Sequence, residues 1–178
     1  MLQSRSELSY PPSLLACKPL DDEALIVSED FQPLFKQWNH WQNGETLPEW
    51  SRFDPLDYPK LLPHVLLVEF HPDNVEDIRI VLMGEHVKGF LGHFPKGTPF
   101  REAMPQENFE DVVTANRYCA ENACAAYFIK SLGWKARELL VYELLKLPFS
   151  KPDGKIGVVC LLRFGLEKSQ IQAVMAAD

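Results

Sequence analysis

Histidine and cysteine side chains are the first candidates for chemistry in this sequence, because both bind transition metals. Two pairs of the five histidines flank short segments, His64 with His71 and His86 with His93. None of them stands in a metal-binding motif. The two closest cysteines, Cys119 and Cys124, have four residues between them, which is neither the spacing of a zinc pair nor that of a redox CxxC. We therefore expect no bound metal or haem.

Sequence motifs for catalysis are also absent. The chain has no GxSxG, GxxxxGK[ST] or HExxH pattern, which would place a nucleophile, a phosphate-binding loop or a zinc-bound water. Gly84, Gly89, Gly92 and Gly97 follow one another, but they lack the strand-into-helix context of a dinucleotide-binding loop. We expect a protein without catalytic activity and without a bound cofactor, flavin included. A small enzyme is the least favoured alternative.

A small-molecule pocket is the stronger functional hypothesis. Aromatic side chains with a few polar groups, placed between a sheet and short helices, form the concave apolar sites that ligands occupy. The residues predicted to line such a pocket are Trp38, His86, Phe90, Phe100, Tyr118 and Cys119. The alternative is that these side chains only fill the core. Three further aromatic residues would suit a partner surface if exposed, namely Trp50, Tyr127 and Trp134.

Composition limits the class of protein. The chain has 178 residues, of which 46% are hydrophobic, which is enough for one domain with one core. Its longest apolar runs, 65–68 and 158–162, are far shorter than the ~20 residues that cross a bilayer. We also expect no signal peptide, because the N-terminal residues lack a basic region followed by an apolar run. The net charge is −7, and the lysines and arginines are dispersed rather than clustered, so the sequence has no basic patch of the kind that binds nucleic acid. We expect a cytoplasmic protein with reduced cysteines that binds neither membrane nor nucleic acid.

Apolar periodicity and turn signals predict two longer helices and five strands. The helices are expected over 30–42 and 108–121, with a short helical turn between Asp54 and Leu62. The strands are expected over 64–70, 78–83, 125–132, 137–149 and 156–164. The leucine spacing in 137–149 also suits a helix, but Pro152-Asp153-Gly154 predicts a tight turn that needs a strand on either side.

This order predicts an α+β domain in which a five-stranded antiparallel sheet has helices packed on one face. Residues 30–165 would form the domain, 1–29 an N-terminal arm and 166–178 a C-terminal tail. The arm contains apolar residues that we expect to be buried against another surface rather than exposed to solvent, namely Leu14, Leu15, Leu25, Ile26 and Val27. We expect them to form the interface of a twofold homodimer. The alternative is that the arm folds back across its own sheet.

The order of elements resembles the PAS fold, and several short stretches are similar to a PAS-like family found in bacteria, mostly in proteins of unknown function. The stretches are Trp38, Trp41, Leu47-Pro48, Phe53-Asp54-Pro55, 61–65 (LLPHV), Gly84, Gly92 and Gly97. The resemblance covers roughly residues 31–164. Members of this family often have an arginine three residues before the glycine that ends the second strand, and a threonine after it. This chain has Val81 and Glu85 there, so no site built on that pair is expected.

The resemblance implies a sensory, regulatory or protein-interaction role, since PAS domains elsewhere hold haem, flavin or small organic ligands between the sheet and the helices. The fold does not choose among these roles. The segments outside the domain are too short for an output domain. We therefore expect a stand-alone module that binds a small ligand or a protein partner and signals through protein–protein contacts. The alternative is a ligand-free dimerisation or adaptor module.

Overall fold

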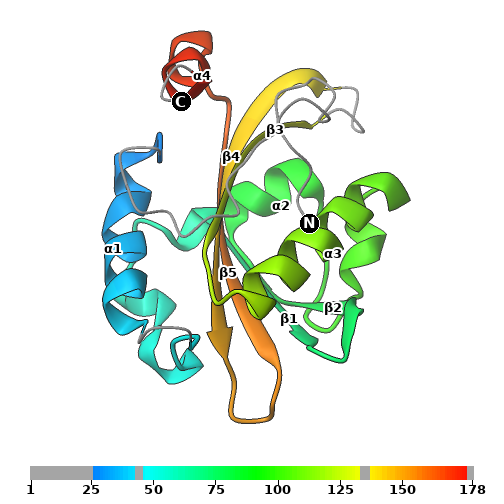
Figure 1. Ribbon diagram of the computed structural model, residues 1–178. Coiled ribbons are helices and arrows are strands. Elements are labelled where there is room, and N and C mark those ends of the chain that lie inside the picture. The colour runs from blue at the N-terminus through cyan, green and yellow to red at the C-terminus, as the bar shows by residue number, and fades with distance from the viewer. Residues whose placement is uncertain (1–25, 43–45, 133–136, 176–178) are drawn as a thin grey trace.

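The computed structural model describes residues 26–42, 46–132 and 137–175. At its centre is one five-stranded antiparallel sheet in the order β2-β1-β5-β4-β3 (Figure 1). The strands are β1 (Val65–His71), β2 (Asn74–Met83), β3 (Ala126–Leu132), β4 (Arg137–Ser150) and β5 (Ile156–Phe164). The α+β class and the five-stranded antiparallel sheet predicted from the sequence are thereby confirmed. The last strand along the chain, β5, lies in the middle of the sheet.

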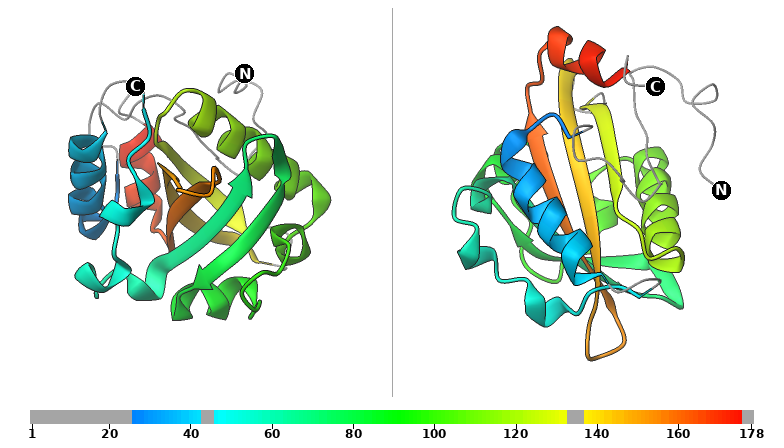
Figure 2. Two further views of the ribbon diagram at one scale, coloured as in Figure 1. Left: turned by 90° about the horizontal axis from the view of Figure 1, so that it is seen from below. Right: turned by 60° about the vertical axis from the view of Figure 1, so that its left-hand side comes forward.

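The segment whose periodicity suited both a helix and a strand is β4. It pairs with β3 along one edge and with β5 along the other, so that its backbone polar groups are satisfied on both sides. The turn into β5 closes where the Lys151 amide donates to the Lys155 carbonyl at 2.9 Å. Gly154 takes a φ of 81° in this turn, a value that glycine adopts without strain. The long hairpin projects beyond the neighbouring strands (Figure 2).

Both faces of the sheet are covered by helices. One face has α2 (Glu85–Leu91), the 3-10 turn η7 (Phe100–Ala103) and α3 (Gln106–Glu121), and the other has the 3-10 turn η3 (Glu29–Phe31) and α1 (Gln32–Trp41). A further helix, α4 (Lys168–Met175), lies beyond β5 in the predicted tail. Figure 1 shows α1 on one side of the sheet and α2 and α3 on the other. The expected packing of helices on one face thus holds for α2 and α3, and α1 adds a layer on the opposite face.

The second layer is possible because β4 and β5 are apolar on both faces. Neighbouring residues of a strand point to opposite faces, yet residues 141–149 and 156–162 are buried without interruption. The apolar stripe of α1, which includes Leu34 and Trp38, packs against this second face. Trp38 is 1% exposed, and its indole Nε1 donates to the Pro148 carbonyl of β4 at 2.9 Å.

The segment before α1 is bound to the sheet by the buried carboxylate of Glu143 on β4. The Ser28 amide donates to this carboxylate at 3.2 Å, and the Ser28 hydroxyl donates to its other oxygen. The Tyr127 hydroxyl of β3 donates to it at 2.7 Å and accepts a bond from the Val27 amide at 3.0 Å. A buried carboxylate is stable only when it is hydrogen-bonded, so these contacts fix residues 27–28 against their own sheet.

Candidate functional site

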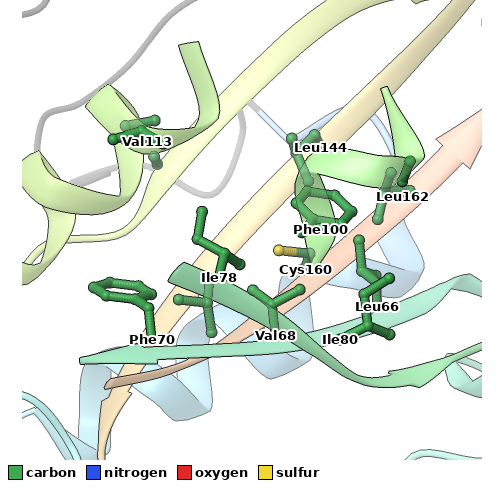
Figure 3. Close-up of a cluster of buried hydrophobic side chains, with 14 of the residues drawn as sticks. Leu66, Val68, Phe70, Ile78, Ile80, Phe100, Val113, Leu144, Cys160 and Leu162 are labelled. Atoms are coloured by element: carbon green, nitrogen blue, oxygen red, sulfur yellow. The ribbon is translucent and has the colours of Figure 1, made fainter. Parts of the chain in front are cut away.

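An apolar cavity of about 40 Å³ lies between the sheet and the layer formed by α2, η7 and α3. Its floor consists of side chains from β1, β4 and β5, namely Leu66, Val68, Tyr142, Leu144, Lys146, Cys160 and Leu162. Its roof consists of Leu91, Phe100, Met104 and Val112. Figure 3 shows Phe100 reaching from its 3-10 turn toward Cys160 and the apolar side chains of the sheet.

Strand register places the floor residues in rows. Leu66 of β1 pairs with Cys160 of β5, and Cys160 pairs in turn with Lys146 of β4. Leu144 and Leu162 pair in the next row. Paired residues of neighbouring strands point to the same face of a sheet. Lys146 therefore shares the cavity floor with these apolar side chains.

Of the described residues that line the cavity, Lys146 alone carries a charge. It is 3% exposed, and its ammonium donates to Oδ1 of Asn116 on α3 at 2.7 Å. Asn116 is itself 1% exposed, and its Nδ2 has no hydrogen-bond partner in the described part of the chain. An ammonium has three N–H groups and a side-chain amide has two, so both residues have donors to spare.

The other two polar groups of the lining are neutral near pH 7. Burial raises the pKa of the Cys160 thiol to about 11. Burial also raises the pKa of the Tyr142 hydroxyl, and the negative charge of Asp111 raises it further. Neither group supplies a counter-charge for Lys146. The cavity therefore presents one positive charge within an otherwise neutral and mostly apolar lining.

Four of the six predicted pocket residues lie on this side of the sheet, and one of them, Phe100, lines the cavity. Phe90 and Tyr118 pack against the same core cluster without lining the cavity. The ring of Phe90 stacks on that of Phe164, with centroids 4.2 Å apart. Cys119 is buried in this cluster as well.

The other two predicted pocket residues lie elsewhere. Trp38 packs on the α1 side, because the first helix covers the face of the sheet opposite to α2 and α3. His86 is exposed on α2, where its ring meets that of His64 edge to face with centroids 4.7 Å apart. Across the described ranges, no three His, Cys, Asp or Glu side chains form a metal-ligand set.

Apart from Phe100, the sequence pattern did not reveal the residues that line the cavity, and the charged one among them is Lys146. A lysine within a strand normally points to solvent, because its ammonium is rarely buried without a partner. The signal for burial is the apolar run on either side of it, LLVYELLKLPF. A strand of this composition is typically covered on both faces, which leaves a lysine in its middle no exposed side.

Two of the residues predicted to form a dimer interface lie in the described part of the chain. Ile26 is 1% exposed and belongs to the core on the α1 side of its own chain, and Val27 packs partly buried against the same core. Leu14, Leu15 and Leu25 lie outside the described residues. The structure therefore places the last residues of the predicted arm on their own sheet.

The three aromatic residues considered for a partner surface differ in placement. Tyr127 is buried, because its hydroxyl binds the enclosed Glu143 carboxylate. Trp50 is partly buried and packs edge to face against Phe149, with ring centroids 5.8 Å apart. Trp134 lies outside the described residues.

Comparison with known proteins identifies the family. The sequence model of the PAS domain family matches residues 27–162, from the segment before α1 to near the end of β5. A search of curated proteins gave no match. Among the described helices, none has the length and apolar character needed to span a membrane. With the family match over most of its length and an antiparallel sheet in the order β2-β1-β5-β4-β3, the chain belongs to the PAS domain family.

Proposed function

We propose that the protein is a sensory module in which the cavity beneath α2 and α3 binds a small ligand and the α1 side of the sheet transmits the bound state to a protein partner. Membership of the PAS domain family indicates a sensory or regulatory module in general. The finer proposal rests on Lys146, a buried cation in an apolar cavity without a counter-charge in the described lining. Burying an ammonium costs folding free energy, so a role in binding explains this residue better than a role in stability.

The strand β4 connects the cavity to the opposite layer. Lys146 stands between Leu145 and Leu147, whose side chains belong to the core on the α1 side. Two residues beyond Lys146, the Pro148 carbonyl accepts the hydrogen bond from the Trp38 indole of α1. Protein interiors are close-packed, so a displacement of one strand shifts the side chains on both of its faces. A ligand that moves Lys146 would therefore alter the position of α1.

The second candidate is a ligand-free dimerisation or adaptor module, and the size of the cavity favours it. Sites for drug-sized ligands occupy roughly 300–1,000 Å³. The cavity of this protein has about 40 Å³. Any ligand that fits without a change in the fold must therefore be very small, and an adaptor needs none.

Native mass spectrometry of the gently purified protein distinguishes the candidates. A stoichiometric adduct that is lost on denaturation supports the sensory module. A homodimer without an adduct supports the adaptor, and conversion of a retained compound supports an enzyme. A monomer that carries no adduct, and acquires none from a mixture of small metabolites, contradicts both leading candidates.

A further inference from the structure

We propose that the cavity binds a short-chain monocarboxylate, with the carboxylate on Lys146 and the hydrocarbon part against the apolar lining, an inference that rests on the ligand-binding function proposed above. The cavity lies between the sheet and η7 with α3, and Lys146 is the charged residue of its described lining. An isolated buried charge carries a desolvation penalty of several kcal/mol. A ligand anion at this position would offset that penalty.

The charges near Lys146 favour an anion. On the same face of the sheet, Nζ of Lys130 lies 3.5 Å from Oδ2 of Asp111 on α3. Burial lowers the pKa of Lys130, the negative charge of Asp111 raises it, and the positive charge of Lys146 lowers it, because the two ammonium groups repel each other. Asp111 is already paired with Lys130, and its side chain is 60% exposed. The described residues thus leave Lys146 without a carboxylate of its own.

The amide of Asn116 occupies one of the three N–H groups of the Lys146 ammonium. The bond from the Lys146 ammonium to Asn116 Oδ1 holds the amide in place, and Asn116 Nδ2 has no acceptor among the described residues. Asn116 itself does not line the cavity, so the carboxylate of the ligand accepts from the two remaining N–H groups of the Lys146 ammonium. Hydrogen bonds to a charged group are roughly twice as strong as those between neutral groups. A neutral amide or alcohol would gain less from the Lys146 ammonium.

The volume of the cavity limits the length of the ligand. One water needs about 10–15 Å³ of cavity measured in this way and takes about 30 Å³ of liquid volume. The 40 Å³ of this cavity therefore holds about three waters, or roughly 90 Å³ of liquid. A carboxylate with one or two further carbons has a comparable volume, and one with three further carbons is at the upper limit. Long-chain fatty acids and ring-bearing ligands are too large.

The remaining lining excludes a second charge. Apart from Lys146, the lining consists of apolar side chains and the neutral hydroxyl and thiol of Tyr142 and Cys160. A dicarboxylate or a phosphorylated metabolite would bring charge that finds no partner there. Met104 and Val112 are the two lining residues that are partly exposed.

Titration calorimetry with three probes tests the ligand class on the full chain. Butyrate is the expected ligand, butyramide is its uncharged counterpart, and octanoate is a longer acid. We expect saturable binding of butyrate, and binding of butyramide weaker by about tenfold or more, because the ion pair with Lys146 is lost. Absence of butyrate binding, equal binding of butyramide, or tighter binding of octanoate would each overturn the proposal.

A matched pair of lysine variants tests the role of Lys146. Lys146→Met keeps the length of the side chain and removes its charge. It also leaves the buried Oδ1 of Asn116 without its donor, which lowers the folding stability, so circular dichroism first establishes that the variant is folded. Lys88→Met is the control, because Lys88 pairs with Glu85 on α2 at the surface. We expect Lys146→Met to bind butyrate about tenfold or more weakly and Lys88→Met to bind it as the wild type does. Unchanged butyrate binding by Lys146→Met would overturn the proposal.

The ligand class and the sensory function can fail separately. If native mass spectrometry detects another retained ligand while butyrate does not bind, the proposed ligand class is wrong and the sensory function stands. If the protein retains no ligand and binds none of the three probes, both proposals are contradicted.

Discussion

At the scale of single residues, Trp38 contributes both packing and a hydrogen bond to the α1 side of the sheet. Trp38→Ala is expected to lower the free energy of unfolding by about 3–5 kcal/mol, because it removes a fully buried aromatic side chain. Trp38→Phe keeps most of the ring but leaves the Pro148 carbonyl without its donor, with an expected cost of about 1–3 kcal/mol. Urea denaturation measures both changes. Leu56→Ala is the control, since Leu56 is 73% exposed, and a cost of Trp38→Ala no larger than that of the control would contradict this placement.

The surroundings of His64 lead us to expect that the protein loses folding stability in mild acid. Its partly buried ring contacts the Leu162 carbonyl through Nδ1 at 3.1 Å and faces the ring of His86. Burial lowers the pKa of His64, and the positive charge of Arg163 lowers it further. As the pH falls below about 6.5, the unfolded chain accepts a proton that the folded protein resists. Stability is therefore fully present above about pH 6.5 and is lost as the pH falls through the folded-state pKa.

Urea denaturation at about pH 7.5 and about pH 5.5 checks this prediction with the wild type and His64→Asn. Asparagine keeps an N–H donor for the Leu162 carbonyl and cannot be protonated, so the variant should lose less stability on acidification. The pKa values of Asp30 and Glu69 are lowered, so these carboxylates titrate below this range. Exposed His71, replaced by asparagine, is the control. Equal losses in the wild type and His64→Asn would contradict the prediction.

At the scale of elements, two glycines at α2 have opposite expected effects. An added Cβ at Gly84 would lie 2.2 Å from the Leu62 carbonyl oxygen and 2.5 Å from that of Pro63, although the Gly84 φ of −70° suits any residue. Gly84→Ala should therefore destabilise the fold by about 1–3 kcal/mol through steric overlap alone. Around Gly89, within the helix, no atom other than those of its chain neighbours and the helix's own backbone lies within 4 Å of such a Cβ.

The matched change Gly89→Ala should stabilise the protein by about 0.5–1 kcal/mol, because alanine is the better helix former. Thermal unfolding of the two variants beside the wild type measures the difference. If Gly84→Ala unfolds at the same temperature as Gly89→Ala, the close approach of residues 62–63 to the start of α2 is not as the structure shows.

The types of the main elements could be predicted from the sequence, whereas the layer of α1 could not. The turn at Pro152-Asp153-Gly154 was enough to identify β4 as a strand, because a tight turn requires a strand on either side. The apolar stripe of the first helix shows that one of its faces is buried, but either side of a sheet with two apolar faces can bury it. The uninterrupted apolar run of β5 contains the missing information, since it requires cover on both sides.

The cavity was only partly predictable, because its lining depends on which elements pack on each face of the sheet. Phe100 could be found because it is an aromatic residue in a glycine- and proline-rich loop between the sheet and a helix. Trp38 lies on the opposite side of the sheet together with its helix, although its apolar stripe suits burial on either side. To predict the burial of Lys146 one must know the register of three strands, because its neighbours in the sheet are distant in sequence. Pairwise register of this kind is a property of the fold rather than of any local pattern.

At the scale of the whole molecule, we propose that the chain forms a homodimer through the N-terminal arm. The outer residues of α1 include Lys36, Asn39 and His40, all exposed, so the helix presents a polar surface to solvent. Apolar residues of the arm, such as Leu14 and Leu15, are the better candidates for a contact between two chains.

Sedimentation velocity of the full chain and of a chain that starts at Ile26 tests this proposal. The shortened chain keeps Ile26 and the residues bound to Glu143, because their removal would open the core on the α1 side. We expect a dimer for the full chain and a monomer for the shortened one at the same protein concentration. A monomeric full chain, or a shortened chain that remains dimeric, contradicts the proposal.

Because β5 is the last strand along the chain and the central strand of the sheet, a growing chain on the ribosome cannot complete its sheet until residue 164 has been made. Until then, the pair formed by β1 and β2 is not joined to the pair formed by β3 and β4. Val65 of β1, for example, lacks its partner Leu161 of β5. Both pairs expose apolar faces, which makes incomplete chains prone to aggregation and dependent on chaperones. A premature stop codon before residue 156 should therefore yield a fragment that is degraded in the cell rather than a smaller working domain.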